Sequence, residues 1–278
     1  MKDYLNFNFD ANDFDFVSVY DELPLWSAPF GMTLLETIKL KENAKVLDVG
    51  CGTGFPLLEI AGRFGNSSKM YGIDPWIKAL ERIGLKLKKY NIENVYLING
   101  SAEKLPFENN FFDLVVSNNG INNVDNPEIA LNEIFKVLKN DGQFVFTMNL
   151  PDTMKEFYDV FEIVLNELGL INEIEKMKEH IFEKRKPVDY MITLIKNAGF
   201  KITNAIEKSF NMRFANGTAM LNYHFIKSHF AESWKSVAGQ ENMERVFELI
   251  EKNLNDTAKS KAYLSLGIPY VCFDCNKT

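Results

Sequence analysis

Three closely spaced glycines follow a short apolar run near residue 50. The run KVLDV, residues 45–49, leads into Gly50, Gly52 and Gly54. Glycines allow a tight turn and let a ligand approach the backbone, and a helix that follows offers free N–H groups at its N-terminus. Such loops bind nucleotides. The lysine that a phosphate-binding P-loop needs is missing, and the spacing G-x-G-x-G differs from the dinucleotide pattern G-x-G-x-x-G because Phe55 occupies the last position.

A carboxylate stands at the end of the next apolar run. Asp74 closes KMYGID, residues 69–74, and is followed by Pro75 and Trp76. Ligands of open parallel sheets bind at the carboxyl edge of the strands, where Asp74 can accept both hydroxyls of a ribose. Its alternative role, as the cap of a following helix, is compatible with this one. Trp76 is a candidate for packing on an adenine ring, with a core aromatic as the alternative.

These residues need a sheet that brings strand ends to one edge. Apolar, β-branched runs predict strands at 45–49, 69–74, 95–99, 112–117 and 143–148. Helical spacing predicts helices at 56–64 and 75–90, and Asn126-Pro127 starts another that ends near a turn at 140–142. Strands that alternate with helices predict an α/β fold with a parallel sheet covered on both faces.

The second half of the sequence is mostly helical. Helices are expected at 151–170, 172–186, 187–199, 216–237 and 240–254, with an extended segment at 201–214 and a closing strand at 269–274. We expect one domain over residues 1–278, with helical insertions at about 152–186 and 215–262. Long insertions in compact domains are usually functional, so we expect a lid, with plain packing bulk as the alternative.

The glycine loop is part of a wider resemblance. With Asp48 included, D-V-G-C-G-T-G resembles the first signature of class I S-adenosylmethionine-dependent methyltransferases. GIDP (72–75) and GSAEKLPF (100–107) resemble the second and third signatures, and the whole resemblance covers roughly residues 14–150. The small-molecule branch, which includes ubiquinone- and menaquinone-biosynthesis methyltransferases, is the most similar. This implies a Rossmann-like seven-stranded, mostly parallel sheet, S-adenosylmethionine as cofactor and a small-molecule methyl acceptor.

The resemblance also implies where the amino-acid end of the cofactor would lie. Asp48 and Gly50 would be close to it, and Asp48 would receive the ammonium. Asn118, at the end of the fourth strand, would present its backbone carbonyl to the same group. Tyr20, in the stretch FDFVSVYDELPLW of residues 14–26, would assist with the carboxylate, unless it only packs the N-terminal helix.

The adenine would meet the segment after the third strand. Ser101 replaces the Asp that the family usually places there, and a hydroxyl still accepts a hydrogen bond, without charge assistance. Ala102 and Glu103 would offer backbone N–H groups, and we expect the Glu103 side chain to be solvated. The predicted cofactor-binding residues are Tyr20, Asp48, Gly50, Cys51, Gly52, Gly54, Asp74, Pro75, Trp76, Ser101, Ala102, Glu103 and Asn118.

The sequence does not identify a catalytic base. Methyl transfer from a sulfonium is a direct displacement, which mainly requires alignment and exclusion of water. Relatives often carry His in the loop after the fourth strand, whereas residues 118–123 are rich in Asn, which is no base near pH 7. His224, on the second insertion, is a candidate base, with a core or surface role as the alternative. His180 lies on a charged helix and is expected to be solvated.

Composition and cysteine usage bound the remaining possibilities. The net charge of −7 counts against nucleic-acid partners. Cys272 and Cys275 would point to opposite faces of a strand, so no metal site is expected. The sequence contains no run of about 18 apolar residues, so no membrane-spanning helix is expected. The N-terminus lacks a signal-peptide core, and three sparse cysteines suggest a reducing compartment, so we expect a cytoplasmic protein. An RNA or protein methyltransferase and a non-catalytic cofactor-binding protein are the alternatives.

Overall fold

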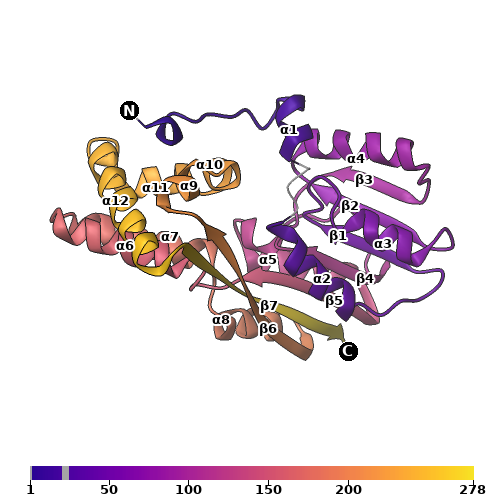
Figure 1. The fold of residues 1–278 in the computed structure, drawn as a ribbon. Coiled ribbons are helices and arrows are strands. Elements are labelled where there is room, and N and C mark those ends of the chain that lie inside the picture. The colour runs from indigo at the N-terminus through magenta and orange to yellow at the C-terminus, as the bar shows by residue number, and fades with distance from the viewer. Residues whose placement is uncertain (1, 21–24) are drawn as a thin grey trace. The chain divides into compact units, whose positions relative to one another are not determined.

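A computed structural model describes residues 2–20 and 25–278 of the chain. Two compact units divide these residues (Figure 1). The unit called here the sheet unit comprises Asp10–Asn149, Pro187–Lys208 and Tyr270–Thr278. The second, called the helical unit, comprises Met1–Phe9, Leu150–Lys186 and Ser209–Pro269. Each unit is therefore assembled from segments that are far apart in the sequence.

A seven-stranded sheet of order β3-β2-β1-β4-β5-β7-β6 organises the described residues. The strands β1 to β5 pair in parallel, and β7 runs antiparallel to β5. The predicted α/β, Rossmann-like fold with a mostly parallel sheet is confirmed. The strand bounds are β1 Lys45–Val49, β2 Lys69–Asp74, β3 Val95–Asn99, β4 Phe112–Asn118, β5 Leu138–Asn149, β6 Phe200–Phe214 and β7 Leu264–Lys277.

The register of the parallel strands brings their carboxyl ends together. Asp48 of β1 lies opposite Gly72 of β2 and Val116 of β4, and Asp74 lies opposite Asn99 of β3. The chain leaves β1 toward β2 on one side and reaches β4 on the other, so β1 and β4 flank the switch point where such sheets bind ligands.

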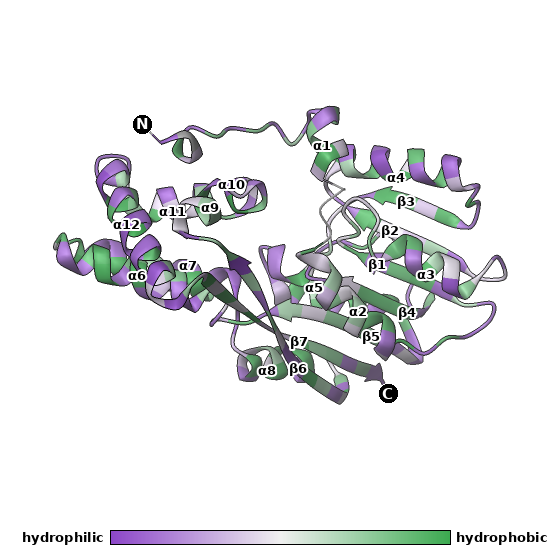
Figure 2. Cartoon of the chain, viewed as in Figure 1, coloured by the Kyte–Doolittle hydropathy of each residue, from purple (hydrophilic) through white to green (hydrophobic). Residues whose placement is uncertain are grey.

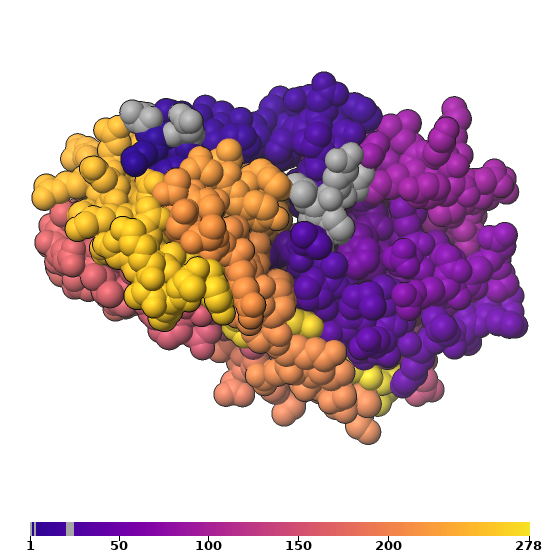
Figure 3. Space-filling view, viewed as in Figure 1, coloured from indigo at the N-terminus to yellow at the C-terminus, as the bar shows by residue number. Residues whose placement is uncertain are grey.

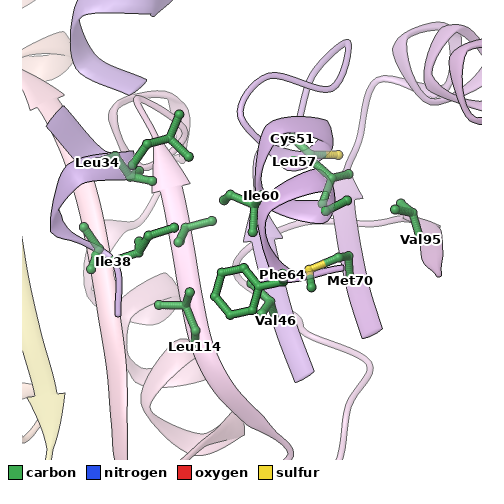
Figure 4. Close-up of a cluster of buried hydrophobic side chains, with 14 of the residues drawn as sticks. Leu34, Ile38, Val46, Cys51, Leu57, Ile60, Phe64, Met70, Val95 and Leu114 are labelled. Atoms are coloured by element: carbon green, nitrogen blue, oxygen red, sulfur yellow. The ribbon is translucent and has the colours of Figure 1, made fainter. Parts of the chain in front are cut away.

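One face of the sheet is covered by α2 (Ser27–Thr37), α3 (Leu57–Phe64) and α4 (Ile77–Tyr90). Figure 4 shows the apolar cluster that joins these helices to the strands. Its labelled side chains are Leu34, Ile38, Val46, Cys51, Leu57, Ile60, Phe64, Met70, Val95 and Leu114. Leu114 and Val116 of this cluster lie two residues apart on β4, so both point to the same face of the sheet as the helices.

The opposite face is covered by α5 (Pro127–Val137) and α8 (Val188–Asn197), which contact each other. Phe144 lies next to Val145 of the first cluster and so points to this second face, where its ring lies 5.3 Å from that of Phe200. The predicted start of α5 is confirmed, since Asn126 Oδ1 accepts a hydrogen bond of 3.1 Å from the Ile129 N–H.

The turn expected at residues 140–142 is wrong. The strand β5 already begins at Leu138 and runs through this segment. Asp141 adopts a left-handed φ of 60°, and the pairing of β4 with β5 shifts between Phe112 and Leu114. The turn-forming residues are accommodated as an irregularity within the strand.

The helical unit contains α6 (Lys155–Glu167), α7 (Ile171–Lys184), α9 (Gly217–Asn222), α10 (His224–His229), α11 (Ala231–Ala238) and α12 (Met243–Lys261). Hydrophilic and hydrophobic residues mix along α12 in Figure 2, as expected of a helix with one buried side. In Figure 3 the residues of α9 to α12 form a continuous orange and yellow surface. Among the described residues, no helix has the length and apolar character required to cross a membrane.

The single helix expected at 216–237 is instead three short helices. The backbone breaks at Tyr223, whose ψ of 125° is extended, and again at Phe230, whose φ is −119°. Burial of Trp234 against Phe157, with ring centroids 3.8 Å apart, fixes the third helix in place. The helical segments fall where insertions were expected, and their role as a lid stays a prediction.

Candidate functional site

The glycine loop after β1 is tied to β2. The N–H groups of Gly50 and Cys51 both donate to the carbonyl of Ile73, at 2.9 and 3.3 Å. A Cβ on Gly50 would lie 2.9 Å from the Cα of Gly120, whereas a Cβ on Gly52 would meet no atom within 4 Å. The loop is therefore packed at Gly50 and borders open space at Gly52, where a ligand can approach the backbone.

The other residues in and around the loop stabilise it through backbone hydrogen bonds and close packing. The N–H of Gly54 donates to the carbonyl of Cys51 at 2.9 Å. The Cys51 side chain is buried, and Gly72 makes room for it, since a Cβ there would lie 2.9 Å from its Sγ. Burial raises the pKa of the Cys51 thiol well above its usual range. Pro75 is exposed after the end of β2.

Asp74 joins the glycine loop to the start of α4. Its Oδ2 accepts from the Gly52 N–H and its Oδ1 from the Trp76 N–H, both at 2.8 Å. Burial raises the pKa of Asp74, and these two bonds lower it. Each oxygen keeps a further lone pair, so the carboxylate can still accept hydrogen bonds from a vicinal diol.

Asp48 is a fully buried carboxylate without a partner among the described residues. Neither of its oxygens makes a hydrogen bond of normal geometry. Burial, followed by the charge of Asp74, raises its pKa to about 8, and the backbone N–H of Leu57 partly opposes this rise. Buried charges are normally paired, so this position at the end of β1 suits a cationic group such as an ammonium.

The N-terminal segment is attached to the site through Trp76. Its indole Nε1–H donates to the carbonyl of Ala11 at 2.7 Å, and its ring meets that of Tyr20 edge to face at 5.2 Å. Tyr20 closes α1 (Phe14–Tyr20). Burial and the charge of Asp74 raise the pKa of Tyr20 to about 12, so its hydroxyl stays a donor at neutral pH. Asp21, which follows it in the 14–26 stretch, lies outside the described residues.

The Glu103 side chain lies near the surface, as expected, but it is also held by hydrogen bonds. Its Oε2 accepts a hydrogen bond from the Ser101 hydroxyl, and its Oε1 accepts from the backbone N–H groups of Asp125 and Asn126, at 2.9 and 3.0 Å. The bond from Ser101 is the main cause of a lowered Glu103 pKa. Glu103 therefore joins the loop after β3 to the start of α5. The Glu103 N–H in turn donates to Ser101 Oγ at 3.2 Å, which leaves the N–H of Ala102 for a ligand.

At the end of β4, two asparagines differ in their bonding. Asn118 accepts from Thr147 Oγ1 at 2.8 Å and donates to the carbonyl of Ser27 at 3.3 Å, so its side chain is structural. The Asn119 side chain is different, because its buried amide nitrogen and oxygen have no partner in the described chain. Its φ is 61°. Asn119 was not among the predicted cofactor-binding residues, although it lies in the asparagine-rich loop 118–123, where Asn can orient a substrate by donating and accepting hydrogen bonds.

The histidines lie in the helical unit. His224, the candidate base, is an exposed residue at the start of α10, with its ring 4.5 Å from that of Tyr223. His180 is partly buried rather than solvated as expected. This burial, together with the charges of Arg185 and Lys184, lowers its pKa to about 4. A role for His224 as a base stays a prediction.

The sheet order, with a glycine loop after β1 and carboxylates near the ends of β1 and β2, is that of the class I S-adenosylmethionine-dependent methyltransferase fold. Residues 40–168 match the family model of the methyltransferase domain. The predicted resemblance to class I methyltransferases, enzymes that use S-adenosylmethionine as their cofactor, is confirmed.

Known proteins support this assignment. The chain is 34% identical to the demethylmenaquinone methyltransferase of Staphylococcus aureus (strain MRSA252) over 130 residues, which is 47% of this chain and 53% of that protein. The chain thus spans about half the length of the curated relatives it matches. The YcgJ protein of Bacillus subtilis has the same fold, with a TM-score of 0.57 and 15% identity over 89% of this chain and 97% of that one. So does geranyl diphosphate methyltransferase, solved with S-adenosylmethionine, with a TM-score of 0.55 and 12% identity over 91% and 85% of the two chains.

Proposed function

We propose that this chain transfers a methyl group from S-adenosylmethionine to a small organic acceptor. The observation that carries the proposal is Asp48, a fully buried carboxylate without a hydrogen bond, beside a glycine loop that borders open space. A carboxylate in this state destabilises the folded chain unless a cation binds to it. The cofactor would bind at the carboxyl edge of β1, β2 and β4.

The residues of the sheet unit fit the parts of this cofactor. Asp48 would receive its ammonium, and the two oxygens of Asp74 would accept the ribose hydroxyls. The Tyr20 hydroxyl is a donor for its carboxylate. The indole of Trp76 and the N–H of Ala102 would bind the adenine. A cofactor with an ammonium, a diol and a planar base thus finds a chemically matched group at each strand end.

The proposed reaction depends little on acid or base catalysis. The bound cofactor supplies a methyl group on a positively charged sulfur, which a nucleophile can displace directly. The chain's own contribution is to orient the acceptor against this methyl group and to exclude water. Asn119, whose buried amide can both donate and accept a hydrogen bond, is suited to orienting it. A cytoplasmic location remains part of the proposal.

The acceptor class rests on two further observations. The curated relative is named for demethylmenaquinone, a small molecule, but its similarity covers only 47% of this chain, so that acceptor is not transferred. The net charge of −7 disfavours an RNA acceptor, because nucleic-acid binding relies on neutralising phosphates. A small organic molecule is the class that both observations favour.

Transfer of a methyl label tests the proposal. The purified chain is incubated with methyl-labelled S-adenosylmethionine and a cell extract divided into metabolite, RNA and protein fractions, with an Asp74→Ala variant as the control. Label in the metabolite fraction, reduced with the variant at a limiting cofactor concentration, is expected, and mass spectrometry then identifies the acceptor. Label in the RNA or protein fraction would show that the acceptor is a macromolecule and not a small molecule. No label in any fraction, with tight cofactor binding by calorimetry, would favour a non-catalytic binding protein.

A further inference from the structure

The helical unit contains a buried arginine without an ion-pair partner. Arg185 follows α7, where its N–H donates to the carbonyl of Ile181 at 2.9 Å, and only 2% of the residue is exposed. Its Nε and Nη1 atoms are buried and make no hydrogen bond with the described residues. No described carboxylate forms a salt bridge with it. Arginines are almost never buried in this way unless they are paired.

Aromatic rings surround this charge. The guanidinium carbon lies 5.1 Å from the centre of the Tyr158 ring and 5.9 Å from that of Phe230. Contacts of a cation with aromatic rings recover only a small part of the free energy lost when a guanidinium leaves water. The rings therefore provide an apolar wall but do not replace the missing anion.

The hydroxyl of Tyr158 adds a second unused donor. It accepts a hydrogen bond of 3.0 Å from Trp234 Nε1, and its own proton has no acceptor in the described part of the chain. Tyr158 is 5% exposed and Trp234 is fully buried, with its ring stacked on Phe157 at 3.8 Å. The cluster thus collects donors without acceptors.

We infer that Arg185 and Tyr158 form a binding site, within the helical unit, for the carboxylate or phosphate of a small molecule with an apolar body. The Nε–H and Nη1–H groups of Arg185 lie on different sides of the guanidinium, so each donates separately to oxygens of such an anion, and the Tyr158 hydroxyl is a further donor. The aromatic rings match the apolar body. This inference concerns binding alone and stands independently of methyl transfer.

Calorimetry with simple anions tests the site on the full chain. The probes are benzoate, octanoate and phenyl phosphate, with benzamide as the neutral counterpart of benzoate. At least one of the three anions is expected to bind with a Kd below 1 mM, and benzamide is not. The relative affinity of benzoate and phenyl phosphate then distinguishes a carboxylate site from a phosphate site. If none of the three anions binds the natural chain, the inference is wrong.

Two variants assign the binding to this cluster. Arg185→Met should lower the affinity for the bound anion at least tenfold. Lys184→Met, which removes the same charge from an exposed neighbour, should change this affinity less than twofold. Equal affinity in the natural chain and Arg185→Met would overturn the assignment. In a Trp26→Phe/Trp76→Phe background, Trp234 is the only tryptophan, and its fluorescence should change on binding.

Thermal unfolding separates a ligand-binding arginine from a structural one. Removal of an unpaired buried charge by an apolar residue of similar length should leave the Tm of Arg185→Met equal to or above that of the natural chain. A variant that unfolds, or that melts well below the natural chain, would show that Arg185 is a structural residue and would contradict the inference.

Discussion

Gly50 and Gly120 approach each other so closely that neither has room for a side chain. A Cβ on Gly50 would lie 2.9 Å from Gly120 Cα, and one on Gly120 would lie 2.5 Å from the carbonyl oxygen of Val49 and the hydroxyl of Ser117. The loops that follow β1 and β4 are thus in direct backbone contact. This contact fixes the positions of the two strand ends that the proposed cofactor site requires.

The first prediction concerns this contact. Gly120→Ala should lower the free energy of unfolding by about 1–3 kcal/mol, because the added methyl group clashes with backbone that cannot move aside. Chemical denaturation measures the loss. Gly62→Ala is the control, since Gly62 is an exposed helical residue with no atom within 4 Å of its Cβ, and alanine there should be neutral or stabilising. Equal stability of both variants would contradict the close packing.

A second prediction separates ligand binding from stability. Gly52 has a φ of 51° and open space around its Cβ position, so Gly52→Ala should cost only about 1–2 kcal/mol of backbone strain. It should nevertheless weaken S-adenosylmethionine binding at least tenfold, because the methyl group enters the space proposed for the cofactor. Gly169, in the helical unit, has a similar φ of 72° and open space around its Cβ position. Gly169→Ala should therefore leave the affinity for S-adenosylmethionine, measured by calorimetry, unchanged. An unaffected Gly52→Ala affinity would move the cofactor away from the loop.

The third prediction tests Asp74. Asp74→Ala should weaken S-adenosylmethionine binding at least tenfold, about 1.4 kcal/mol, because the ribose loses its acceptors and the Gly52 N–H loses its partner. The matched control is Asp113→Ala, since Asp113 bonds to the N–H of Lys45 at the start of β1, at 2.9 Å. That variant should reduce stability without changing the affinity of the folded protein. Tight binding by Asp74→Ala in calorimetry would exclude the ribose assignment.

The fourth prediction is a dependence of stability on pH. The pKa of Asp48 is about 8 in the folded chain, above the value near 3.9 of an unfolded Asp. Between these values the folded state holds a proton that the unfolded state has released, so the free energy of unfolding falls as the pH rises from about 4 to 8. Asp48→Asn removes this loss, and its Tm should exceed that of the natural chain by about 5 °C at pH 8.5, with a gap that closes toward pH 4.

Asp113 provides a control of opposite sign. Hydrogen bonds and ion pairs with Lys45, Lys139 and Lys41 overcome the effect of burial and hold its pKa at about 2. Its contribution to stability is therefore present above about pH 4 and is lost as the pH falls toward 2. Asp113→Asn should lower the Tm at pH 8.5, where Asp48→Asn raises it. A Tm gap for Asp48→Asn that does not vary with pH would refute the assignment of this titration to Asp48.

Much of the sheet unit could be predicted because local and long-range signals agree there. The predicted bounds of β1, β2 and β3 match the structure, since each strand is a short apolar run closed by polar residues or glycine. The carboxyl-edge position of Asp74 followed from the parallel order alone. Local signals misled at residues 140–142, where strand pairing overrides a turn-forming sequence.

The interactions that sequence reasoning missed depend on side chains meeting from distant segments. Glu103 looks like a surface residue until the start of α5 supplies two N–H groups to it. Arg185 ends a stretch of mixed charges, so its burial depends on rings contributed by residues 158 and 230. No periodicity or spacing in the sequence contains this information.

The place of β7 in the sheet has a consequence for how the chain must be made. It lies between β5 and β6, yet it follows both in the sequence. When a ribosome has completed β5 at Asn149, the strand that will pair with its free edge begins only at Leu264, so this edge is left unpaired while more than a hundred further residues, β6 among them, emerge. Unpaired edges of this kind recruit other chains. Yield during expression should therefore depend more on the rate of translation and on chaperones than on the stability of the finished protein.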